Sequence, residues 1–319
     1  MWSYLIRRLA QAFLILFIIT MLCFILTRLS SDPMAEYANR PNMTDADRAA
    51  IRRRLGLDQP IPIQYIKWLA VAAQGDLGDS FFSHQPVLLM IEQRLPMTLI
   101  LMGTAEIVII IVSLILGVVA AVKKYSFTDN LITSFSFIGY SIPIFFIALG
   151  CIEIFAVQFK AWGLPYLPTG ADIWDPQNPL QLVRHLVLPV FCLVAIQTAG
   201  YSRYLRSSIL EVLGMDYVRT ARAKGLSSRN VLFKHALRNA ILPFVTIVGL
   251  DIPFLLGGAL VTESVFAWPG MGRLFWEYAQ RGDYPVVLGV LLVTSTAVVF
   301  FTIIVDLAYT IVDPRIRLS

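Results

Sequence analysis

Four acidic side chains lie inside long apolar stretches of the sequence: Glu106, Glu153, Asp251 and Asp306. An ionisable group at membrane depth is energetically costly unless it faces a cavity or a polar partner. Glu106 and Asp251 lie deepest, and two interpretations of them carry equal weight: they line a pathway for a cation or a proton, or they form hydrogen bonds between helices. Glu153 lies near the end of its stretch, within reach of water. Asp306 lies near the end of its stretch and is expected to pair with a cytoplasmic arginine, so Glu106, Glu153 and Asp251 are the candidate pathway-lining residues.

Other reactive groups form no recognisable site. The three histidines are scattered, and the three cysteines lie in apolar runs without the spacing of metal ligands. The sequence contains no GxxxxGK[ST] phosphate loop, so the chain is not an ATPase. Gly139-Tyr140-Ser141 lacks the second glycine of a hydrolase nucleophile elbow. We therefore expect no catalytic residue, no metal site and no cofactor bound by this chain.

Residues 206–238 form a basic connection that is too long for a simple turn. Gly214 and Gly225 divide it into short helical pieces. One of these pieces covers residues 216–224, and Gly225 permits a turn with positive φ that ends it. The connection therefore contains a short helix between two apolar stretches.

The charges of this short helix favour a docking role. Asp216 lies at its start and Arg222 and Lys224 lie near its end, which complements the helix dipole. A helix of this kind presents Tyr217 and Ala221 to a partner protein. The alternative is a surface helix that lies on anionic lipid headgroups, which also attract arginine and lysine.

The composition indicates which elements position these residues. Of 319 residues, 57% are hydrophobic and 15% are charged, with a mean hydropathy of +0.70. Soluble domains are about 45–50% apolar and about 25% charged. The sequence therefore predicts an all-α integral membrane protein, and six apolar stretches are long enough to span a bilayer: residues 9–29, 98–122, 131–157, 186–205, 240–262 and 285–312.

Basic residues set the expected orientation. Lysines and arginines concentrate before the first span, after the second, between the fourth and fifth, and after the sixth. The positive-inside rule then places both termini in the cytoplasm. The net charge of +5 is largely this orientation signal, so no nucleic-acid partner is needed. The first span is longer than a signal-peptide core and reads as an uncleaved anchor.

The chain divides into three parts on this reading. Residues 1–29 form the cytoplasmic N-terminus and the first span, residues 30–97 form a small external helical cap, and residues 98–319 form a five-helix core that includes the 206–238 connection. Within the cap, Thr44 to Asp47 resembles a capping box, and Gly56 and Gly75 are expected to end two short helices. A passive loop and a docking surface are equally good interpretations of this cap.

Nine segments, spread from end to end of the chain, carry a resemblance to a known family: residues 7–9, 55–58, 75–78, 210–213, 217–225, 234–243, 268–273, 281–285 and 313–317. The chain resembles the permease subunits of ABC importers of the dipeptide/oligopeptide/nickel group, namely dipeptide and oligopeptide permease B. The similarity extends over the whole chain, and the general importer signature Glu-Ala-Ala-x-x-x-Gly is altered here to Arg219-Thr220-Ala221 with Gly225.

The resemblance implies a fold and a set of partners. It implies an ABC type I importer permease in a bacterial-type plasma (inner) membrane, paired with a second homologous permease, two ATPases and an external solute-binding protein. ATP and magnesium then belong to the ATPase subunits. The short cytoplasmic helix becomes an ATPase-coupling helix, whose candidate residues are Asp216, Tyr217, Arg219, Thr220, Ala221, Arg222, Ala223, Lys224 and Gly225.

The resemblance also implies a substrate. We expect a permease subunit that forms half of a pathway for di- or oligopeptides and couples ATP hydrolysis by its partners to uptake. Nickel chelates and glutathione are alternatives within the family. A proton-driven secondary transporter that uses Glu106 and Asp251 is the alternative from another class, although such a transporter has no need of a docking helix between residues 206 and 238.

Overall fold

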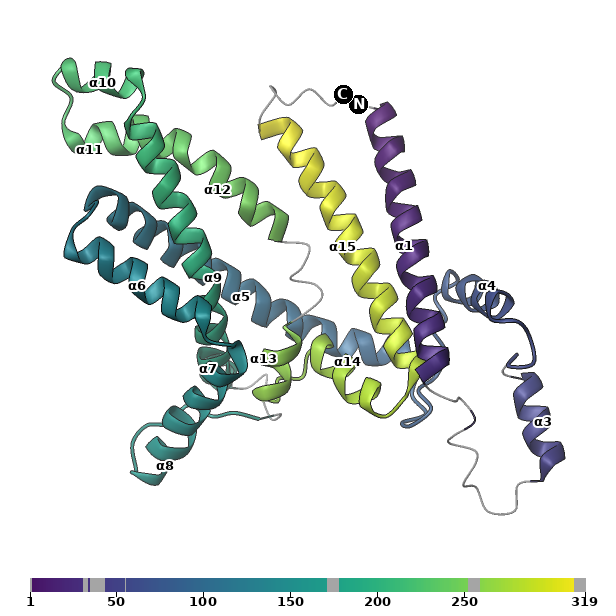
Figure 1. The fold of residues 1–319 in the computed structure, drawn as a ribbon. Coiled ribbons are helices and arrows are strands. Elements are labelled where there is room, and N and C mark those ends of the chain that lie inside the picture. The colour runs from purple at the N-terminus through teal and green to yellow at the C-terminus, as the bar shows by residue number, and fades with distance from the viewer. Residues whose placement is uncertain are drawn as a thin grey trace. The chain divides into compact units, whose positions relative to one another are not determined.

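The computed structural model describes residues 2–30, 34, 44–54, 56–170, 178–251 and 259–312. Its elements are helices (Figure 1), and six of them are long and apolar enough to cross a membrane, which confirms the all-α expectation. The elements are α1 (Trp2–Ser30), α3 (Asp45–Arg54), α4 (Ile61–Ala72), α5 (Val87–Val122), α6 (Phe127–Ser141), α7 (Ile144–Cys151), the π-helix η1 (Ile152–Gln158), α8 (Phe159–Ala161), α9 (Pro179–Leu213), α10 (Asp216–Ala223), α11 (Ser228–Asn230), the π-helix η2 (Val231–Ala236), α12 (Leu237–Asp251), α13 (Leu260–Val265), α14 (Met271–Gln280) and α15 (Tyr284–Val312).

The chain forms two compact units. One unit contains Met1–Met97 together with Pro269–Ser319, and the other contains Thr98–Trp268. Helix α5 runs from the first unit into the second, and Pro96 lies inside it, beside the boundary. The first unit therefore joins the two ends of the sequence, while the second holds the middle of the chain.

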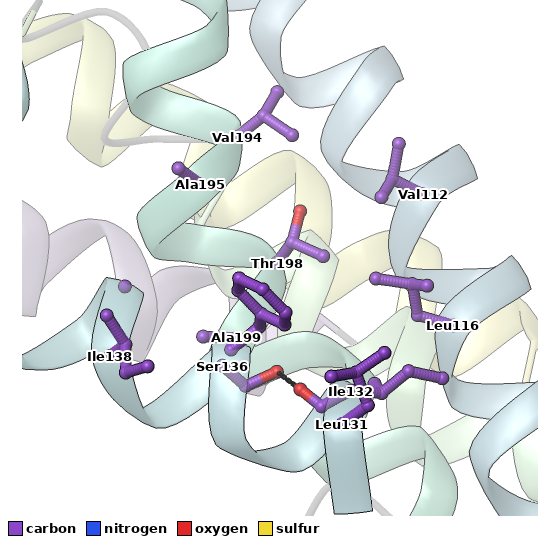
Figure 2. A pocket seen from close by; sticks show the side chains of 12 residues that line it. Val112, Leu116, Leu131, Ile132, Ser136, Ile138, Val194, Ala195, Thr198 and Ala199 are labelled. Carbon is purple, nitrogen blue, oxygen red and sulfur yellow. Dashed lines mark hydrogen bonds between the residues drawn. The ribbon is translucent and has the colours of Figure 1, made fainter. Parts of the chain in front are cut away.

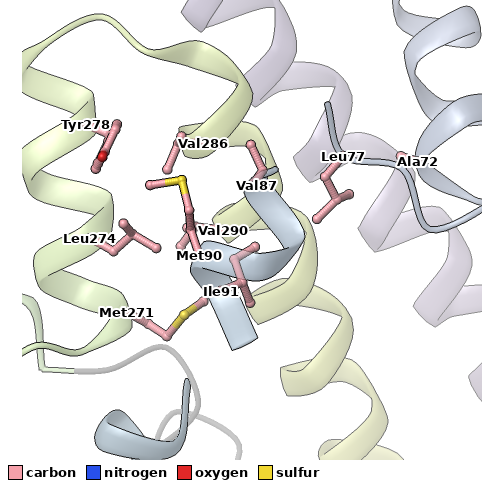
Figure 3. Packing of buried hydrophobic residues seen from close by; sticks show 10 residues of the cluster. All are labelled: Ala72, Leu77, Val87, Met90, Ile91, Met271, Leu274, Tyr278, Val286 and Val290. Carbon is pink, nitrogen blue, oxygen red and sulfur yellow. The ribbon is translucent and has the colours of Figure 1, made fainter. Parts of the chain in front are cut away.

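The first unit has a core of interlocking apolar side chains (Figure 3). Val87, Met90 and Ile91 at the start of α5 are buried against Leu274 of α14 and Val286 of α15. Helix α15 approaches closely here because it has a glycine at position 289, where a Cβ atom would lie 2.5 Å from a Val87 methyl carbon. A second cluster of aromatic and aliphatic side chains joins α1, α4 and α15.

Helices α3 and α4 form between α1 and α5, as the sequence predicts. The Thr44 amide donates to Asp47 Oδ2 at 3.0 Å, and the Asp47 amide donates to Thr44 Oγ1 at 3.2 Å, so the capping box is confirmed. Hydrogen bonds from Thr44 hold the pKa of Asp47 below its usual range. Gly56 and Gly75 adopt φ values of +64° and +88°, which confirms them as helix-ending residues.

The second unit packs α5, α6 and α9 closely. A Cβ atom on Gly139 of α6 would lie 2.7 Å from the Ala195 carbonyl oxygen of α9. One on Gly117 of α5 would lie 3.0 Å from the Ser202 carbonyl oxygen, also on α9. Small residues at these positions allow close approach of the helix backbones, as in other membrane bundles.

The third apolar stretch is not one continuous helix, contrary to the expected span 131–157. Helix α6 ends at Ser141, Ile142 is extended with φ −90° and ψ 124°, and Pro143 caps the start of α7. Proline lacks an N–H group and disfavours a helical conformation in the residue before it, which explains the break. The helix long enough to span a membrane instead covers Ile144–Ala161.

Two further boundaries differ from expectation. The helix expected at 240–262 begins earlier, at Ser228, and ends at Asp251, while residues 252–258 lie outside the described part of the chain. Helix α9 continues to Leu213. The connection between these long helices is therefore residues 214–227, and the ends of the 206–238 segment are helical. Polar residues extend these helices beyond their apolar stretches, where hydropathy gives no signal.

Candidate functional site

Tyr201 joins the two deep acids of the second unit. Its hydroxyl donates to Asp251 Oδ2 at 2.5 Å and lies 3.4 Å from Glu106 Oε1. Glu106 comes from α5 and is 6% exposed, Tyr201 comes from α9, and Asp251 is the last residue of α12. Three helices that are distant in sequence thus bring two carboxyl groups to one phenol.

The hydrogen bonds leave one carboxyl group poorly satisfied. A tyrosine hydroxyl has a single proton, and the 2.5 Å bond to Asp251 uses it. Asp251 also accepts from Gln197 Nε2 at 2.9 Å. Glu106 therefore retains acceptor capacity in a buried position, where a cation or a shared proton is stabilising.

A cavity of about 290 Å³ adjoins this cluster. Glu106, Gln197 and Asp251 are its polar lining residues, and the rest of the lining is apolar. A mostly apolar cavity with a few converging polar groups is typical of a ligand site. The apolar lining residues come from α5, α7 and α9: Met102, Ala105, Ile109, Ile144, Leu193 and Ile196.

Glu153, the third acid that the sequence singles out, is not part of this cluster. It lies in η1, is exposed, and accepts a hydrogen bond from Gln158 Nε2 at 2.7 Å. Glu263 is another buried acid, which accepts from Thr98 Oγ1 at 2.9 Å and which the sequence analysis missed. Asp306 lies in α15, and its side chain is outside the described residues.

Sequence reasoning also missed Gln197 and Tyr201. They are four residues apart on α9 and therefore share one face of that helix. Polar side chains at this spacing inside an apolar stretch were the available signal. Their pairing with Glu106 on α5 and Asp251 on α12 had no such signal, because the sequence does not indicate which helices are neighbours.

A separate cavity of about 440 Å³ lies between α5, α6 and α9 (Figure 2). Its lining is apolar except for Ser136 and Thr198, and the Ser136 hydroxyl donates to the Ile132 carbonyl oxygen at 2.8 Å. None of its lining residues is ionisable. Its chemistry therefore suits apolar groups and not charged ones.

Helix α10 is held against its own chain by one face. Val218 is fully buried and Ala221 is 5% exposed, so Ala221 faces inward and does not present itself to a partner as the sequence analysis expected. Tyr217 is 40% exposed, and its hydroxyl accepts from Asn239 Nδ2 at 2.7 Å. The remaining α10 side chains and those at its end are exposed: Asp216, Arg219, Thr220, Arg222, Ala223 and Lys224.

Gly225 ends this helix as predicted. It adopts φ +79°, its amide donates to the Arg222 carbonyl at 2.9 Å, and the next amide, of Leu226, donates to the Ala221 carbonyl at 3.4 Å. This left-handed closure satisfies the last carbonyl groups of the helix. It leaves Arg222 and Lys224 on an exposed surface, with an exposed ion pair of 3.5 Å between Arg219 and Asp216 beside them.

Comparisons with known proteins give matches over nearly the whole chain. A family model described as "Binding-protein-dependent transport system inner membrane component" matches residues 113–318, and the model of the N-terminal part of such components matches residues 1–102. The oligopeptide transport system permease protein AppB of Bacillus subtilis (strain 168) is 42% identical over 99% of this chain and 100% of its own length.

Two further relatives match at nearly full length. The dipeptide transport system permease protein DppB of Escherichia coli (strain K12) is 37% identical over 99% of each chain. The glutathione transport system permease protein GsiC of Escherichia coli O6:H1 is also 37% identical over 99% of each chain. With family models that match from end to end, this chain belongs to the binding-protein-dependent inner membrane transport components, as a multi-pass permease subunit of the peptide/nickel type of ABC importer and not as its ATPase.

Proposed function

We propose that the chain forms half of the translocation pathway of an importer for di- or oligopeptides, and that a second homologous permease forms the other half. The observation that carries this proposal is the Tyr201 cluster, where buried Glu106 and half-buried Asp251 border a cavity. A peptide carries an α-ammonium group, which two carboxylates and a phenol oxygen can accept. The names of the similar permeases support the same substrate class.

The partners follow from the family and from α10. Two ATPase subunits hydrolyse ATP with magnesium, and an external solute-binding protein delivers the peptide. Helix α10 docks in a groove of one ATPase through its exposed side, with Arg222 and Lys224 facing ATPase carboxylates. ATP-driven closure then shifts α10 and biases the helices between two arrangements.

Both termini lie in the cytoplasm in this proposal, on the same side as α10. The distribution of lysine and arginine along the sequence supports this orientation. The segment between α1 and α5 then lies outside, where a binding protein docks. Glu153, exposed in η1, lies in the middle of the helix Ile144–Ala161 and not near its outer end, because this helix begins at Ile144 and not at residue 131 as the sequence predicted.

Purification in mild detergent tests the assembly. We expect mass spectrometry of the tagged chain's partners to show a second permease and two ATPases, and we expect reconstituted uptake to require ATP. A chain that purifies alone and transports peptide under a proton gradient without ATP would instead establish a secondary transporter driven through Glu106 and Asp251.

Charge reversal tests the docking helix. The double variant Arg222→Glu/Lys224→Glu is expected to abolish ATP-driven uptake while the chain still reaches the membrane. The matched control is Lys123→Glu/Lys124→Glu, which reverses two exposed lysines that follow α5 and do not belong to α10. Intact ATP-driven uptake in the α10 variant would defeat the docking role.

Competition defines the substrate. Labelled dipeptide uptake is expected to be inhibited by unlabelled di- and oligopeptides with a free amino group. If glutathione or a nickel chelate competes more strongly than every peptide, that compound is the substrate instead. Glutathione is included because the similar permease GsiC is named for its transport.

A further inference from the structure

The first unit contains a second polar cavity, of about 520 Å³, outside the Tyr201 cluster. Its lining comes from the end of α1, the α3–α4 region, the loop before α5 and the start of α15. Its volume is typical of a small-molecule site. The side chains that carry the argument are Arg28, Gln59, Gln64, Lys67, Asp76 and Asp79.

Arg28 presents buried donors without acceptors. Its guanidinium lies 5.1 Å from the Phe24 ring centroid and 4.3 Å from that of Tyr284, so aromatic rings hold it in place. Its Nε and Nη1 atoms are buried and have no hydrogen-bond partner among the described residues. A buried charged donor without an acceptor is destabilising, so this site favours an anion.

Two buried acceptors without donors line the same cavity. The carbonyl oxygens of the Gln59 and Gln64 side chains are buried and have no partner within the described part of the chain. The Gln64 amide nitrogen donates to the Gln59 backbone carbonyl at 2.7 Å, which orients that side chain. The cavity therefore favours a ligand that carries both an anionic group and N–H donors.

Charges of both signs surround this cavity without neutralising each other. Arg53 and Lys67 line it with Arg28, and Asp76 and Asp79 line it too. No ion pair joins these opposite charges among the residues described. Separated charges of both signs match a zwitterion, because each end of such a ligand meets its opposite charge.

We propose that this cavity is a second substrate site, which binds a short peptide with free termini. The peptide carboxylate binds the Arg28 guanidinium with support from Arg53 and Lys67, the ammonium group faces Asp76 and Asp79, and peptide N–H groups donate to Gln59 and Gln64. This inference rests on the proposed peptide substrate. In the proposed orientation, the segment between α1 and α5 that lines this site lies on the outer side of the membrane.

A thermodynamic cycle, in which the peptide carboxylate and Arg28 are changed separately and together, tests the carboxylate contact. The complete permease–ATPase complex in lipid nanodiscs, without binding protein, is titrated with labelled Ala-Ala and with its C-terminal amide. We expect amidation to weaken binding at least tenfold in the unaltered complex. In Arg28→Gln, Ala-Ala itself binds at least tenfold more weakly, and amidation has no further effect.

Controls separate this contact from misfolding. Arg184→Gln makes the same change at an exposed arginine in the other unit, which bonds the Tyr166 carbonyl, and it is expected to bind both ligands normally. Arg28→Lys keeps the charge without the planar fork and is expected to give an intermediate loss. The ammonium contact is tested by the same kind of comparison. Asp76→Asn/Asp79→Asn is expected to weaken the binding of Ala-Ala but not that of N-acetylated Ala-Ala, which has no ammonium group.

Three outcomes would overturn the inference. In the first, amidation weakens binding by the same factor in the unaltered complex and in the Arg28→Gln complex. Arg28→Gln could weaken only the binding of the solute-binding protein, which would place a partner's acidic side chain in the cavity. Occupancy could instead follow the phosphatidylglycerol content of the nanodisc. ATP-driven peptide uptake with binding protein, measured alongside, tests the proposed function separately, since it persists if this inference alone fails.

Discussion

Arg206 of α9 and Asp129 of α6 form a two-point ion pair. Arg206 Nε donates to Asp129 Oδ1 at 2.7 Å, and Nη2 donates to Oδ2 at 2.6 Å. The Tyr125 amide adds a third hydrogen bond to this carboxylate, at 2.8 Å. Asp129 is 2% exposed and Arg206 is 22% exposed, so the pair is largely shielded from water. It fixes the start of α6 on α9.

Asp129→Asn is expected to destabilise the second unit. The substitution leaves the Arg206 guanidinium partly buried without its counter-charge. Removing one partner of a buried ion pair costs about 3–5 kcal/mol, and the partial exposure of Arg206 favours the lower end, about 3 kcal/mol. Thermal unfolding in detergent, followed by circular dichroism, measures the loss.

The matched control is Asp216→Asn, which removes the exposed 3.5 Å pair with Arg219. Both side chains of that pair are more than 70% exposed. Exposed pairs contribute little to stability. An equal fall in unfolding temperature for both variants would contradict a special role for the pair of Asp129 and Arg206.

Acid is expected to remove the contribution of Asp129. The hydrogen bonds from Arg206 hold the pKa of the Asp129 carboxyl below its usual range in the folded state. A depressed folded pKa adds stability above the unfolded pKa of about 3.9, and this stability is lost as the pH falls through the folded value. The stability difference between the unaltered chain and Asp129→Asn should therefore be constant near neutrality and shrink below about pH 4. A difference that grows on acidification would refute this.

The lengths of the apolar stretches and the local signals that start or end helices predicted much of this fold. Six spanning helices, the Thr44 capping box and the stop at Gly225 all follow from short-range rules. The break at Pro143 was visible in the sequence, but a long apolar run on both sides favoured one span over two helices. The pair of Asp129 with Arg206 was not visible, because 77 residues separate its members.

Gly139→Ala is expected to separate α6 from α9. The new methyl group would meet the Ala195 carbonyl oxygen at 2.7 Å, and a backbone atom cannot rotate away. Overpacking of this kind costs about 1–3 kcal/mol. Gly150→Ala is the control, since it makes the same change in α7 with nothing within 4 Å of the new atom. Thermal unfolding should show a loss in the first variant and no loss in the second.

Gly225→Ala is expected to destabilise the turn that ends α10, through backbone strain and not through a steric clash. Its Cβ atom meets nothing within 4 Å, but φ is +79°, where a side chain costs about 1–2 kcal/mol. Gly225→Asn should restore part of the loss, because asparagine tolerates this conformation. If α10 couples ATP hydrolysis to transport, peptide uptake per ATP hydrolysed falls in the alanine variant and recovers with asparagine. Equal coupling in all three proteins would mean that this turn does not position α10.

The candidate site was only half predictable. Hydropathy singled out Glu106 and Asp251 because acids inside spans are rare. It also singled out Glu153, as the acid within reach of water, and the structure places that residue on an exposed π-helix away from the other two. The distinction depends on which helices are neighbours and which face each residue occupies. Tyr201, which joins the two deep acids, is ordinary in sequence and becomes informative only through its position.

Glu106→Gln and Asp251→Asn are expected to raise the KM of peptide uptake by roughly 10- to 150-fold each, because each removes a charged acceptor for the α-ammonium group, worth roughly 1.5–3 kcal/mol. A purely interhelical role would instead lower the unfolding temperature and leave KM unchanged. Glu153→Gln is the matched control, since that carboxyl bonds Gln158 and does not line the cavity. N-acetylated peptide provides the decisive comparison, because it lacks the cation and should be insensitive to both deep substitutions. If unmodified peptide is carried with unchanged affinity and rate by both variants, the two acids do not line the pathway.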